Sequence, residues 1–509
     1  MSPIARKLIL AAIAFLTIAL LTSCRVVRTQ LPHEVVLPLK KEGASPVVRV
    51  EVDGRKQWFL VDTGNSETIV YQPLPDAKDP LPTHRFLLPS IFLEWGVRLV
   101  TRYVHIERLA MGEATAGPVD AALWNWRPDK GQDGILGMDI LGQWATLFDV
   151  DRGEVRFFPA SIALDARLAE IYPGRRWHTY PLSWRIGRPF VTLPTQDGGH
   201  LSFLIDTGAT CNALTYWTAW RRSFSPIGDE KGREFTAEAF GNLGAVSLHR
   251  LDGLLLGDCE VSTLGFLNGF VNMLGFEVLN TTPLVMDGPG KKLWIASLPE
   301  GSASLAEVWL KRLEQGTPLA RGCAVNALMM APTLHPRVLT LLDSPDASVR
   351  TAAWKVLSSS VDVSWDPGPV AASLDSRDPF LRAKAVYTLK WRQAPTYAAR
   401  FTSLLEDPAP GVRTAALCAL ESLKDPARAS RVAARLEDTD RTVRAWAALT
   451  LWNTAAILKG MPCPSWPRIS LIWKAETDTW EIRGDDAALV KGVRAWWVEH
   501  KGDPIFATK

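Results

Sequence analysis

The sequence predicts a multidomain protein in which an all-β bilobal part is followed by an all-α solenoid. Between about residues 34 and 297, one pattern of short apolar strands and glycine turns occurs twice, at an offset of 138 to 145 positions. From about residue 301 the composition shifts to Ala, Leu, Arg and Asp with helical spacing, and a second, shorter pattern repeats. At 509 residues the chain is too long for one hydrophobic core, so several domains are expected.

Residues 1–24 have the features of an export signal. A basic start precedes an apolar run over 8–21, which is too short for a comfortable membrane span. The run ends in Leu21-Thr22-Ser23-Cys24, which resembles the lipobox of bacterial lipoproteins. That resemblance implies lipidation of Cys24, a membrane anchor and a place in the bacterial cell envelope, facing the periplasm or the exterior. Arg25 stands where some lipoproteins carry an Asp that holds them in the inner membrane, so the outer membrane is slightly favoured. An ordinary signal peptide or an uncleaved anchor is the alternative.

The strongest motif is Asp-Thr-Gly at the end of an apolar strand. It occurs in Phe59-Leu60-Val61-Asp62-Thr63-Gly64-Asn65-Ser66 and again, 144 positions later, in Phe203-Leu204-Ile205-Asp206-Thr207-Gly208-Ala209-Thr210. One Asp-Thr-Gly suits almost any strand-ending turn. Two copies after the same kind of apolar run indicate a duplicated unit.

Neighbouring segments repeat at nearly the same offset. Ile135-Leu136-Gly137 returns as Met273-Leu274-Gly275, and the hairpin signal Asp53-Gly54 returns as Asp197-Gly198. These landmarks place lobe one at about 34–160 and lobe two at about 177–297. A helical, basic-tailed connector is expected over 161–176.

The paired motifs resemble those of the aspartic proteases of the pepsin and retropepsin group, over about residues 34 to 297. The resemblance implies the bilobal acid-protease fold, with Asp62 and Asp206 as a catalytic dyad and with no cofactor and no metal. By position, the hydroxyls of Thr63 and Thr207 would hold the two loops together. The N–H groups of Gly64 and Gly208 would face the carboxylates.

The residue after each Asp-Thr-Gly departs from the pepsin pattern, which has Ser or Thr there. Asn65 and Ala209 occupy these positions, and Ser66 and Thr210 follow them. Ala is the retropepsin choice, so Asn65 is the unusual residue, and its amide can hydrogen-bond Asp62.

The implied chemistry is hydrolysis of a peptide bond by an activated water. Two carboxyls within about 3 Å cannot both ionise cheaply and therefore share a proton, which is the established behaviour of aspartic proteases. The ionised partner takes a proton from water while the protonated partner hydrogen-bonds the substrate carbonyl. The sequence leaves open which Asp plays which part.

The region 301–455 carries four aligned segments, each with an acidic turn followed by an apolar residue, Arg and, three residues later, Ala. The arginines are Arg350, Arg382, Arg413 and Arg444, at intervals of 32, 31 and 31, and Ala320-Arg321 suggests a degenerate fifth copy. The pattern resembles short bacterial HEAT repeats, which stack into a solenoid and imply docking of a protein partner or substrate. We interpret the arginines as ties to a neighbouring Asp rather than as ligand contacts.

We interpret residues 456–509, with an expected helix over 485–500, as a cap on the solenoid rather than as a binding site. Two further features remain open in the sequence. The segment 240–244 forms either a flap hairpin or a plain surface loop. Cys211 and Cys259 lie in one lobe of an exported chain, so a disulfide is conceivable, although their spacing does not show that they meet.

Charge and histidine content narrow the function classes. A net charge of +3 gives no reason to expect nucleic acid as a partner, and eight scattered His argue against a metallopeptidase. The resemblances to aspartic proteases, HEAT repeats and lipoproteins imply a membrane-tethered aspartic endopeptidase whose solenoid docks a partner or substrate. The alternatives are a catalytically weak or inactive peptide-binding lipoprotein that acts as a scaffold, and a purely structural envelope lipoprotein.

Overall fold

The structure is a computed structural model, and it falls into two compact units, Met1–Ser364 and Trp365–Lys509. It describes residues 27–71, 83–92, 98–124, 131–195, 198–215, 218, 226–227, 248–250, 254–257, 259–260, 265–269, 271–300, 302, 304–359, 368–456, 469–474 and 479–506. The segments 1–24 and 240–244 lie outside these residues, so the predicted lipobox and flap do too.

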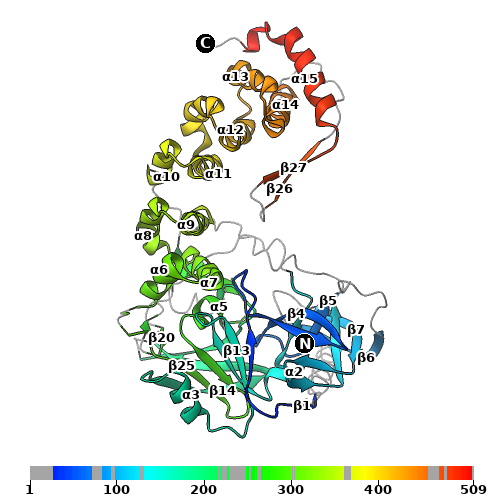
Figure 1. Ribbon diagram of the computed structural model, residues 1–509, viewed down its shortest axis with the longest axis vertical. Helices are drawn as coiled ribbons and strands as arrows, with labels where there is room; N and C mark the ends of the chain where they lie inside the picture. The colour runs from blue at the N-terminus through cyan, green and yellow to red at the C-terminus, as the bar shows by residue number, and fades with distance from the viewer. Residues whose placement is uncertain are drawn as a thin grey trace, which may run out of the picture. The chain divides into compact units, whose positions relative to one another are not determined.

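Lobe one is a curled sheet in the first unit (Figure 1). Its described strands run in the order β1-β9-β8-β3-β4-β11-β5-β10-β7-β6. They are β1 (Thr29–Gln30), β3 (Val47–Val52), β4 (Arg55–Val61), β5 (Ile69–Tyr71), β6 (Thr83–Phe92), β7 (Arg98–Ile106), β8 (Leu109–Met111), β9 (Ala114–Ala116), β10 (Val119–Trp124) and β11 (Gly134–Leu136). Strand β3 alternates because Val50 and Val52 face the core while Arg49 faces solvent. The predicted hairpin follows at Asp53-Gly54, where both residues have positive φ, 44° and 82°, as a two-residue turn between twisted strands requires.

Lobe two and the strands that join the lobes form a second sheet. Its order in the described residues is β18-β19-β22-β17-β23-β16-β15-β14-β25-β24-β12-β13-β2. The strands are β2 (Val35–Pro38), β12 (Ala145–Asp149), β13 (Glu154–Phe158), β14 (Trp177–Arg185), β15 (Arg188–Pro194), β16 (His200–Ile205), β17 (Asn212–Thr215), β18 (Pro226–Ile227), β19 (Leu248–Arg250), β22 (Gly265–Gly269), β23 (Met273–Leu274), β24 (Leu284–Asp287) and β25 (Lys292–Ala296), and a separate pair is β20 (Leu255–Leu256) with β21 (Cys259–Glu260). Antiparallel pairing of β12 with β24 joins the two lobes, and Phe148 meets Phe276 edge to face behind this seam.

The sequence repeat becomes a repeat of strand pairing. In lobe one, β4 runs parallel to β11, with Val61 opposite Leu136. In lobe two, β16 runs parallel to β23, with Ile205 opposite Leu274. Each Asp-Thr-Gly therefore leaves the sheet beside its hydrophobic-hydrophobic-Gly partner. Short helices follow these glycines, α2 (Met138–Leu141) and α5 (Phe276–Leu279), and α3 (Leu164–Ile171) lies in the predicted connector.

One expectation for lobe one is wrong. The prolines between Pro73 and Pro89 predict a loop, whereas in the described part of this stretch β6 begins at Thr83 and pairs with β7. Pro89 is accommodated because the register shifts between Arg85 and Ser90, and proline is tolerated at such an irregularity.

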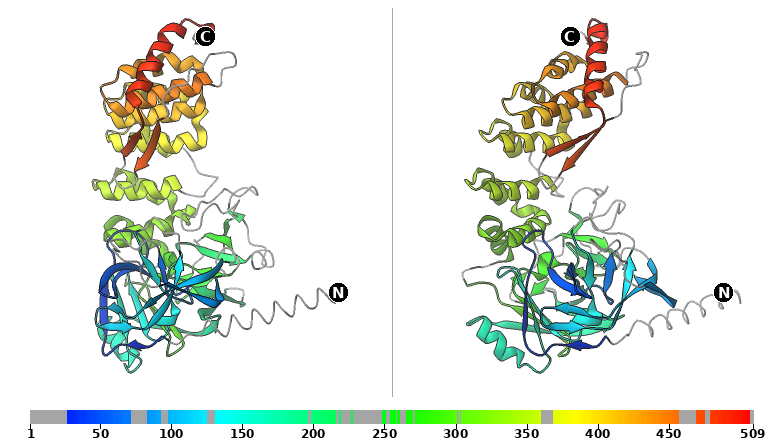
Figure 2. Two further views of the ribbon diagram at one scale, coloured as in Figure 1. Left: turned by 90° about the vertical axis from the view of Figure 1, so that its right-hand side faces the viewer. Right: turned by 45° about the vertical axis from the view of Figure 1, so that its right-hand side comes forward.

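Helical repeats follow the sheets (Figures 1 and 2). The first unit holds α6 (Leu305–Gln315), α7 (Pro318–Met329), α8 (His335–Leu339) and α9 (Ala347–Ser359), and the second holds α10 (Gly368–Ala372), α11 (Pro379–Ser403), α12 (Pro410–Leu423), α13 (Ala429–Ala434), α14 (Arg441–Ala456), β26 (Ser470–Lys474), β27 (Thr479–Arg483) and α15 (Asp486–His500). The four predicted acidic turns are short 3-10 turns at Thr340–Asp343, Ser373–Asp375, Leu404–Glu406 and Arg435–Glu437. The β26–β27 hairpin was not foreseen in the sequence.

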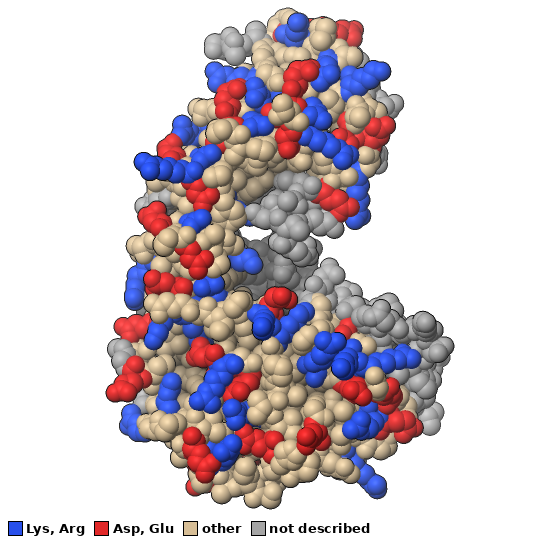
Figure 3. Space-filling view, in the orientation of Figure 1, with Lys and Arg blue, Asp and Glu red and all other residues tan. Residues whose placement is uncertain are grey.

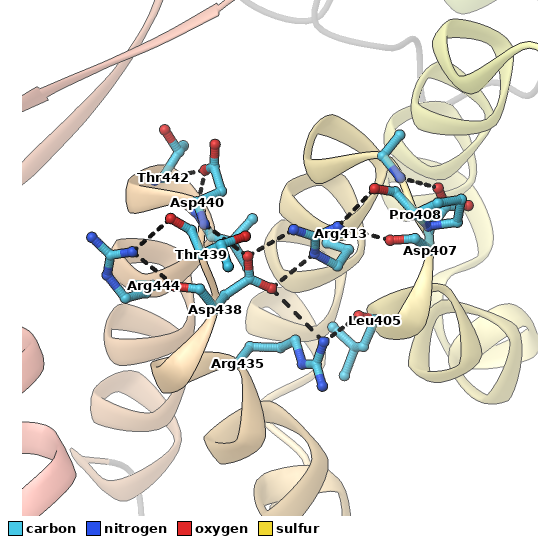
Figure 4. Close-up of polar contacts among 12 residues, drawn as sticks. Leu405, Asp407, Pro408, Arg413, Arg435, Asp438, Thr439, Asp440, Thr442 and Arg444 are labelled. Atoms are coloured by element: carbon cyan, nitrogen blue, oxygen red, sulfur yellow. Dashed lines mark hydrogen bonds and ion pairs between the residues drawn. The ribbon is translucent and has the colours of Figure 1, made fainter.

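Arginine ties between repeats occur in the second unit, as predicted (Figure 4). Arg413 donates two hydrogen bonds to Asp438, at 2.8 and 2.7 Å, and Arg382 donates two to Asp407, at 2.7 and 2.8 Å. Each of these arginines also donates to carbonyl oxygens of its own turn, such as that of Asp407 at 2.8 Å from Arg413. Two-pronged pairs of this kind fix orientation as well as distance. They set the register of one repeat on the next.

The last helix lies against the end of this stack. Arg441 of α14 donates two hydrogen bonds to Asp486, the first residue of α15. At the end of the stack, the carboxylate of Asp486 therefore plays the part that Asp438 plays in the preceding repeat, because each accepts two hydrogen bonds from an arginine. This placement favours a cap over a binding site for α15.

Helix α6 belongs to the same packed unit as lobe two. Trp309 is fully buried, and its indole N–H donates to Thr281 at 3.1 Å. Arg312 donates to Asp151 and to the backbone carbonyl oxygens of Asn280 and Thr281. The composition changes near residue 301, but the packing of the first unit continues beyond it.

Candidate active site

Asp62 and Asp206 occupy the same position in their lobes. Each follows the last residue of a buried strand, β4 or β16. The backbone N–H of Asp62 donates to the carbonyl of Leu136, and that of Asp206 donates to the carbonyl of Leu274, both at 3.1 Å. Matching backbone bonds thus fix the direction in which both carboxyls leave the sheet.

Thr63 and Thr207 join the two loops by four hydrogen bonds. The hydroxyl of Thr63 donates to the carbonyl of Ile205 at 2.7 Å, and the hydroxyl of Thr207 donates to that of Val61 at 2.7 Å. Each hydroxyl also accepts the backbone N–H of the other threonine at 3.1 Å. Both threonines are fully buried, so neither loop can satisfy its polar groups without the other.

Gly64 and Gly208 let the carboxyls approach. A β-carbon on Gly64 would lie 2.2 Å from Cγ of Asp206, and one on Gly208 would lie 2.3 Å from Cγ of Asp62. Each carboxyl therefore rests on the glycine of the opposite loop. Asp206 also hydrogen-bonds Asp62. The two carboxyls predicted as a dyad are brought together across the seam between the lobes.

The donors around the two carboxyls differ. Asp62 accepts the N–H of Gly64 on Oδ1, at 2.8 Å, and the side-chain amide of Asn65 on Oδ2. Asp206 accepts the N–H groups of Gly208 and Ala209, at 3.0 and 2.9 Å, and both reach Oδ1. Asn65 is thus a side-chain donor to one carboxyl only.

Burial dominates the electrostatics of Asp62, whose side chain is only 5% exposed. Burial raises its pKa above the ordinary value, because the charged form loses water. Hydrogen bonds from Asn65, Gly64 and Asp206 lower that pKa, and so does the charge of Arg188, without cancelling the effect of burial.

Arg188 was not singled out in the sequence. It begins β15 beside the two-residue turn Ile186-Gly187, where φ is 53° and 72°. A β-carbon on Gly187 would lie 3.1 Å from Cβ of Ser66, so this turn lies against the loop that carries Asp62. The only sequence signal for Arg188 was the glycine before it, Gly187, which is typical of a hairpin turn.

Each lobe also has an acidic residue two positions after the glycine of its hydrophobic-hydrophobic-Gly segment, Asp139 in lobe one and Glu277 in lobe two. Asp139 accepts the N–H and hydroxyl of Thr68 at 3.0 and 2.8 Å, and the Thr68 hydroxyl accepts the N–H of Gly137 at 3.2 Å. In lobe two, Asn212 accepts the N–H of Gly275 at 2.9 Å. These polar groups hold the glycine loops against the Asp-Thr-Gly turns. The near-constant offset of the repeat could have identified them.

The acidic residues at these equivalent places differ in their surroundings. Burial raises the pKa of Asp139 to about 6, opposed by hydrogen bonds from Thr68 and Ile140. Burial raises the pKa of Glu277 to about 8, opposed only by nearby N–H groups of its own residue and of Asn212. Neither carboxyl oxygen of Glu277 accepts a well-aligned hydrogen bond from the described residues.

The remaining predicted residues are placed as follows. The carbonyl of Ser66 accepts the N–H of Asp139 at 3.1 Å, and that of Asn65 accepts the N–H of Met138 at 2.8 Å. Thr210 is half-buried in the second loop. Cys24 and the side chain of Cys259 lie outside the described residues, so lipidation and the disulfide stay predictions.

Comparisons with known proteins gave one family match and one weak structural match. Residues 367–452 match the HEAT repeat family. An aspartic proteinase from Irpex lacteus is a similar solved structure, with 14% identity and a TM-score of 0.35, covering 53% of this chain and 99% of that one. Those values are too low to establish a common fold. No curated protein matches the sequence.

Two features are absent from the described residues. None of the helices in those parts of the chain is long and apolar enough to span a bilayer. Their His, Cys, Asp and Glu side chains form no group suited to holding a metal ion. On the face shown in Figure 3, acidic and basic side chains of the described residues are interspersed.

Proposed function

We propose that the protein is an aspartic endopeptidase with the bilobal acid-protease fold, in which Asp62 and Asp206 activate a water molecule. The observation that carries this proposal is the pair of threonine-bridged Asp-Thr-Gly loops. They bring two carboxyls together, the buried Asp62 and the half-buried Asp206, each against the glycine of the other loop. Such a pair can hold one proton between its members over a range of acid pH.

The reaction balances with that single proton. The ionised carboxyl takes a proton from water as the water oxygen attacks the peptide carbonyl, and the protonated carboxyl gives its proton to the carbonyl oxygen. A tetrahedral diol results. The first carboxyl then passes its proton to the amide nitrogen, the C–N bond breaks, and one diol hydroxyl returns a proton to the second carboxyl. One water is consumed and the dyad regains its starting state.

The protein's own groups supply the electrostatics. Burial removes water from the dyad, which strengthens every charge interaction there. The N–H groups of Gly64, Gly208 and Ala209 stabilise negative charge without moving during the reaction. The threonine network keeps the two carboxyls in register.

The test is digestion of a peptide library by purified residues 25–509 across acid and neutral pH. Cleavage by the wild type and its loss in both Asp62→Asn and Asp206→Asn would support the proposal. No cleavage by a folded wild type at any pH would overturn it in favour of a peptide-binding scaffold.

The HEAT repeats and the anchor complete the proposal. HEAT repeats commonly mediate protein–protein contacts, so we assign residues 301–455 to docking of a protein partner or substrate. Lipidation at Cys24 would tether the enzyme to the cell envelope, because each buried methylene contributes about 0.8 kcal/mol. Incorporation of a labelled fatty acid, lost in Cys24→Ser, tests the anchor. Unchanged incorporation in that variant would refute it.

A further inference from the structure

We infer that Arg188 binds a carboxylate of the substrate and so selects peptides with an acidic group close to the bond that is cleaved. The carboxylate is either an Asp or Glu side chain or the C-terminal group of the peptide, because both present the same two oxygens. The inference rests on the proposed function and deepens it by naming a substrate class for the same site. Arg188 is in this assignment a specificity-determining residue.

The first argument is the position of Arg188 beside the dyad. Arg188 follows the turn Ile186-Gly187 in the hairpin of β14 and β15. A β-carbon on Gly187 would lie 3.1 Å from Cβ of Ser66, so this turn of lobe two lies against the loop that carries Asp62. Burial raises the pKa of Asp62, and the positive charge of Arg188 acts on the same carboxyl and lowers that pKa. A peptide held for attack at the dyad therefore brings the residues beside its scissile bond near this guanidinium.

The second argument is that the guanidinium has no acidic partner among the described residues. Arg188 is half-buried, and its Nε is buried without a hydrogen-bond acceptor there. The carboxyl of Asp62 accepts hydrogen bonds from its own loop but none from Arg188. A partly buried charge without a counter-ion costs free energy. A carboxylate that arrives with the substrate removes this cost.

The third argument is the chemistry of the guanidinium. Its planar, forked N–H donors match the two oxygens of a carboxylate better than they match the single oxygen of a peptide carbonyl. Because Nε of Arg188 is buried, the two terminal nitrogens are the ones left to meet a ligand. The chain uses the same chemistry internally, since Arg413 holds Asp438 by two hydrogen bonds at 2.8 and 2.7 Å.

Lobe one provides an internal comparison. Val47 and Phe190 are equivalent, because each lies opposite the residue two positions before the Asp of its own lobe. Two residues earlier in the chain stand Ser45 in lobe one and Arg188 in lobe two. A serine has no charge, so only one of the two related places beside the dyad carries a cation. The preference for an acidic group should therefore be confined to one side of the scissile bond.

Kinetics with matched peptides are the first test. Peptides that the wild type cleaves are made in pairs, with Glu or Gln at each position near the scissile bond, and compared at about pH 6, where a Glu side chain is ionised. We expect kcat/KM to be about tenfold higher for Glu at one position, the effect of hydrogen bonds to a charged group. Arg188→Gln should abolish this preference, Arg188→Lys should retain part of it, and Arg188→Glu should replace it with a preference for Lys. The ratio of two peptides within one variant cancels any effect of the substitution on the dyad itself.

Arg185→Gln is the matched control. Arg185 pairs with Arg188 across the same hairpin, but its guanidinium lies over the ring of Phe190 and donates to Ser202. Its removal changes the charge of the hairpin equally and should leave the preference for Glu intact. Loss of the preference in both variants would overturn the inference in favour of a general effect of positive charge.

Peptides cleaved near their C-terminus distinguish the two sources of the carboxylate. Each is made with a free C-terminal carboxylate and with an amide, at several distances from the scissile bond. A preference for the free end identifies the terminal group as the ligand, and a preference for Glu over Gln identifies a side chain. Equal rates in both series would overturn the inference while leaving the peptidase proposal intact.

Peptide binding to Asp206→Asn needs no turnover and keeps both Asp62 and Arg188 in place. Calorimetry with the matched peptides should give a dissociation constant about tenfold lower for the peptide that carries the carboxylate. Addition of Arg188→Gln to this variant should remove the difference. Equal dissociation constants in the Asp206→Asn protein would contradict the assignment. Absence of both peptide binding and hydrolysis in the folded wild type would instead refute the proposed function.

Discussion

Arg312 of α6 forms a two-pronged ion pair with Asp151 in the turn between β12 and β13, with N–O distances of 2.7 and 2.8 Å. The two residues are 161 positions apart in the chain. The Arg312 side chain is 5% exposed and also donates to the carbonyls of Asn280 and Thr281. The first helix after the sheets is therefore held from both lobes.

Truncation within the first unit is expected to destabilise it. Residues 25–300 alone would lose Arg312 and expose the surface that Trp309 covers, so we expect them to unfold at a lower temperature than residues 25–364. Thermal unfolding of the two fragments measures this. Equal melting temperatures would show that α6 to α9 contribute nothing to the fold of the lobes.

Arg312→Met should lower the free energy of unfolding by about 2–3 kcal/mol, because it leaves buried carbonyl oxygens without a donor. Lys311→Met, on the exposed side of the same helix, is the matched control and should change stability little. Denaturant titration compares the two variants. Similar losses in both would assign the effect to the helix rather than to the ion pair.

Catalysis should belong to the pair of carboxyls rather than to either lobe. Asp62→Asn and Asp206→Asn are near-isosteric, so each should keep its fold and lose peptide hydrolysis by at least about a thousandfold, with the double variant little slower than either. Rates of the four proteins, with circular dichroism as the folding control, measure this. A near-wild-type rate in Asp206→Asn would exclude a two-carboxylate mechanism.

Glu277→Gln should stabilise the first unit at alkaline pH. The raised pKa of Glu277 means that folding favours the neutral form of its carboxyl. The free-energy cost of burying the ionised carboxylate is therefore absent below pH 4.5, the ordinary pKa, and complete above about pH 8. The substitution should be nearly neutral at about pH 4 and should raise stability by a few kcal/mol at about pH 9. Denaturant titrations at both pH values measure the difference.

Asp139→Asn is the matched comparison in lobe one. Asp139 accepts hydrogen bonds from Thr68 and Ile140, which offset more of its burial and hold its pKa at about 6, so Asp139→Asn should raise stability less than Glu277→Gln at about pH 9. The two substitutions should therefore differ in the size of their effect on stability at alkaline pH. Destabilisation by Glu277→Gln at alkaline pH would show that its carboxylate has a partner in the folded protein.

The repeat-to-repeat ties predict the stability of the second unit. Arg413→Met leaves the Asp438 carboxylate, only 4% exposed, without its two-pronged partner, and should destabilise this unit by about 3 kcal/mol. Arg431→Met, at an exposed position of α13, is the control. Both effects are measured as the temperature at which the second unit, residues 365–509, unfolds in the full-length protein. Equal effects would mean that Asp438 finds another partner.

The sequence predicted the parts of the site that its repeat records. Two Asp-Thr-Gly loops at one offset were enough to predict that Asp62 and Asp206 are equivalent, and the period of the arginines was enough to predict the ties between repeats. Both predictions rest on spacing along the chain, which backbone geometry converts directly into position.

Other features depend on which surfaces meet, and spacing does not record that. In the sequence, Arg312 looks like any other arginine of a helix, because only the folded chain brings Asp151 to it. Arg188 is near Asp62 only because a turn of lobe two reaches the loop of lobe one. The sequence did not predict strand β6, because Pro89 and the prolines before the strand favour a loop, whereas pairing with β7 decided its conformation.

The exchange of hydrogen bonds between Thr63 and Thr207 also sets an order of events during biosynthesis. A chain made from its N-terminus presents the first Asp-Thr-Gly loop long before the carbonyl of Ile205 exists to receive the Thr63 hydroxyl. Half of the proposed peptidase is then a lobe with one carboxyl and an unsatisfied threonine. Under the proposed function, the nascent chain therefore has no complete dyad until its second half has been made.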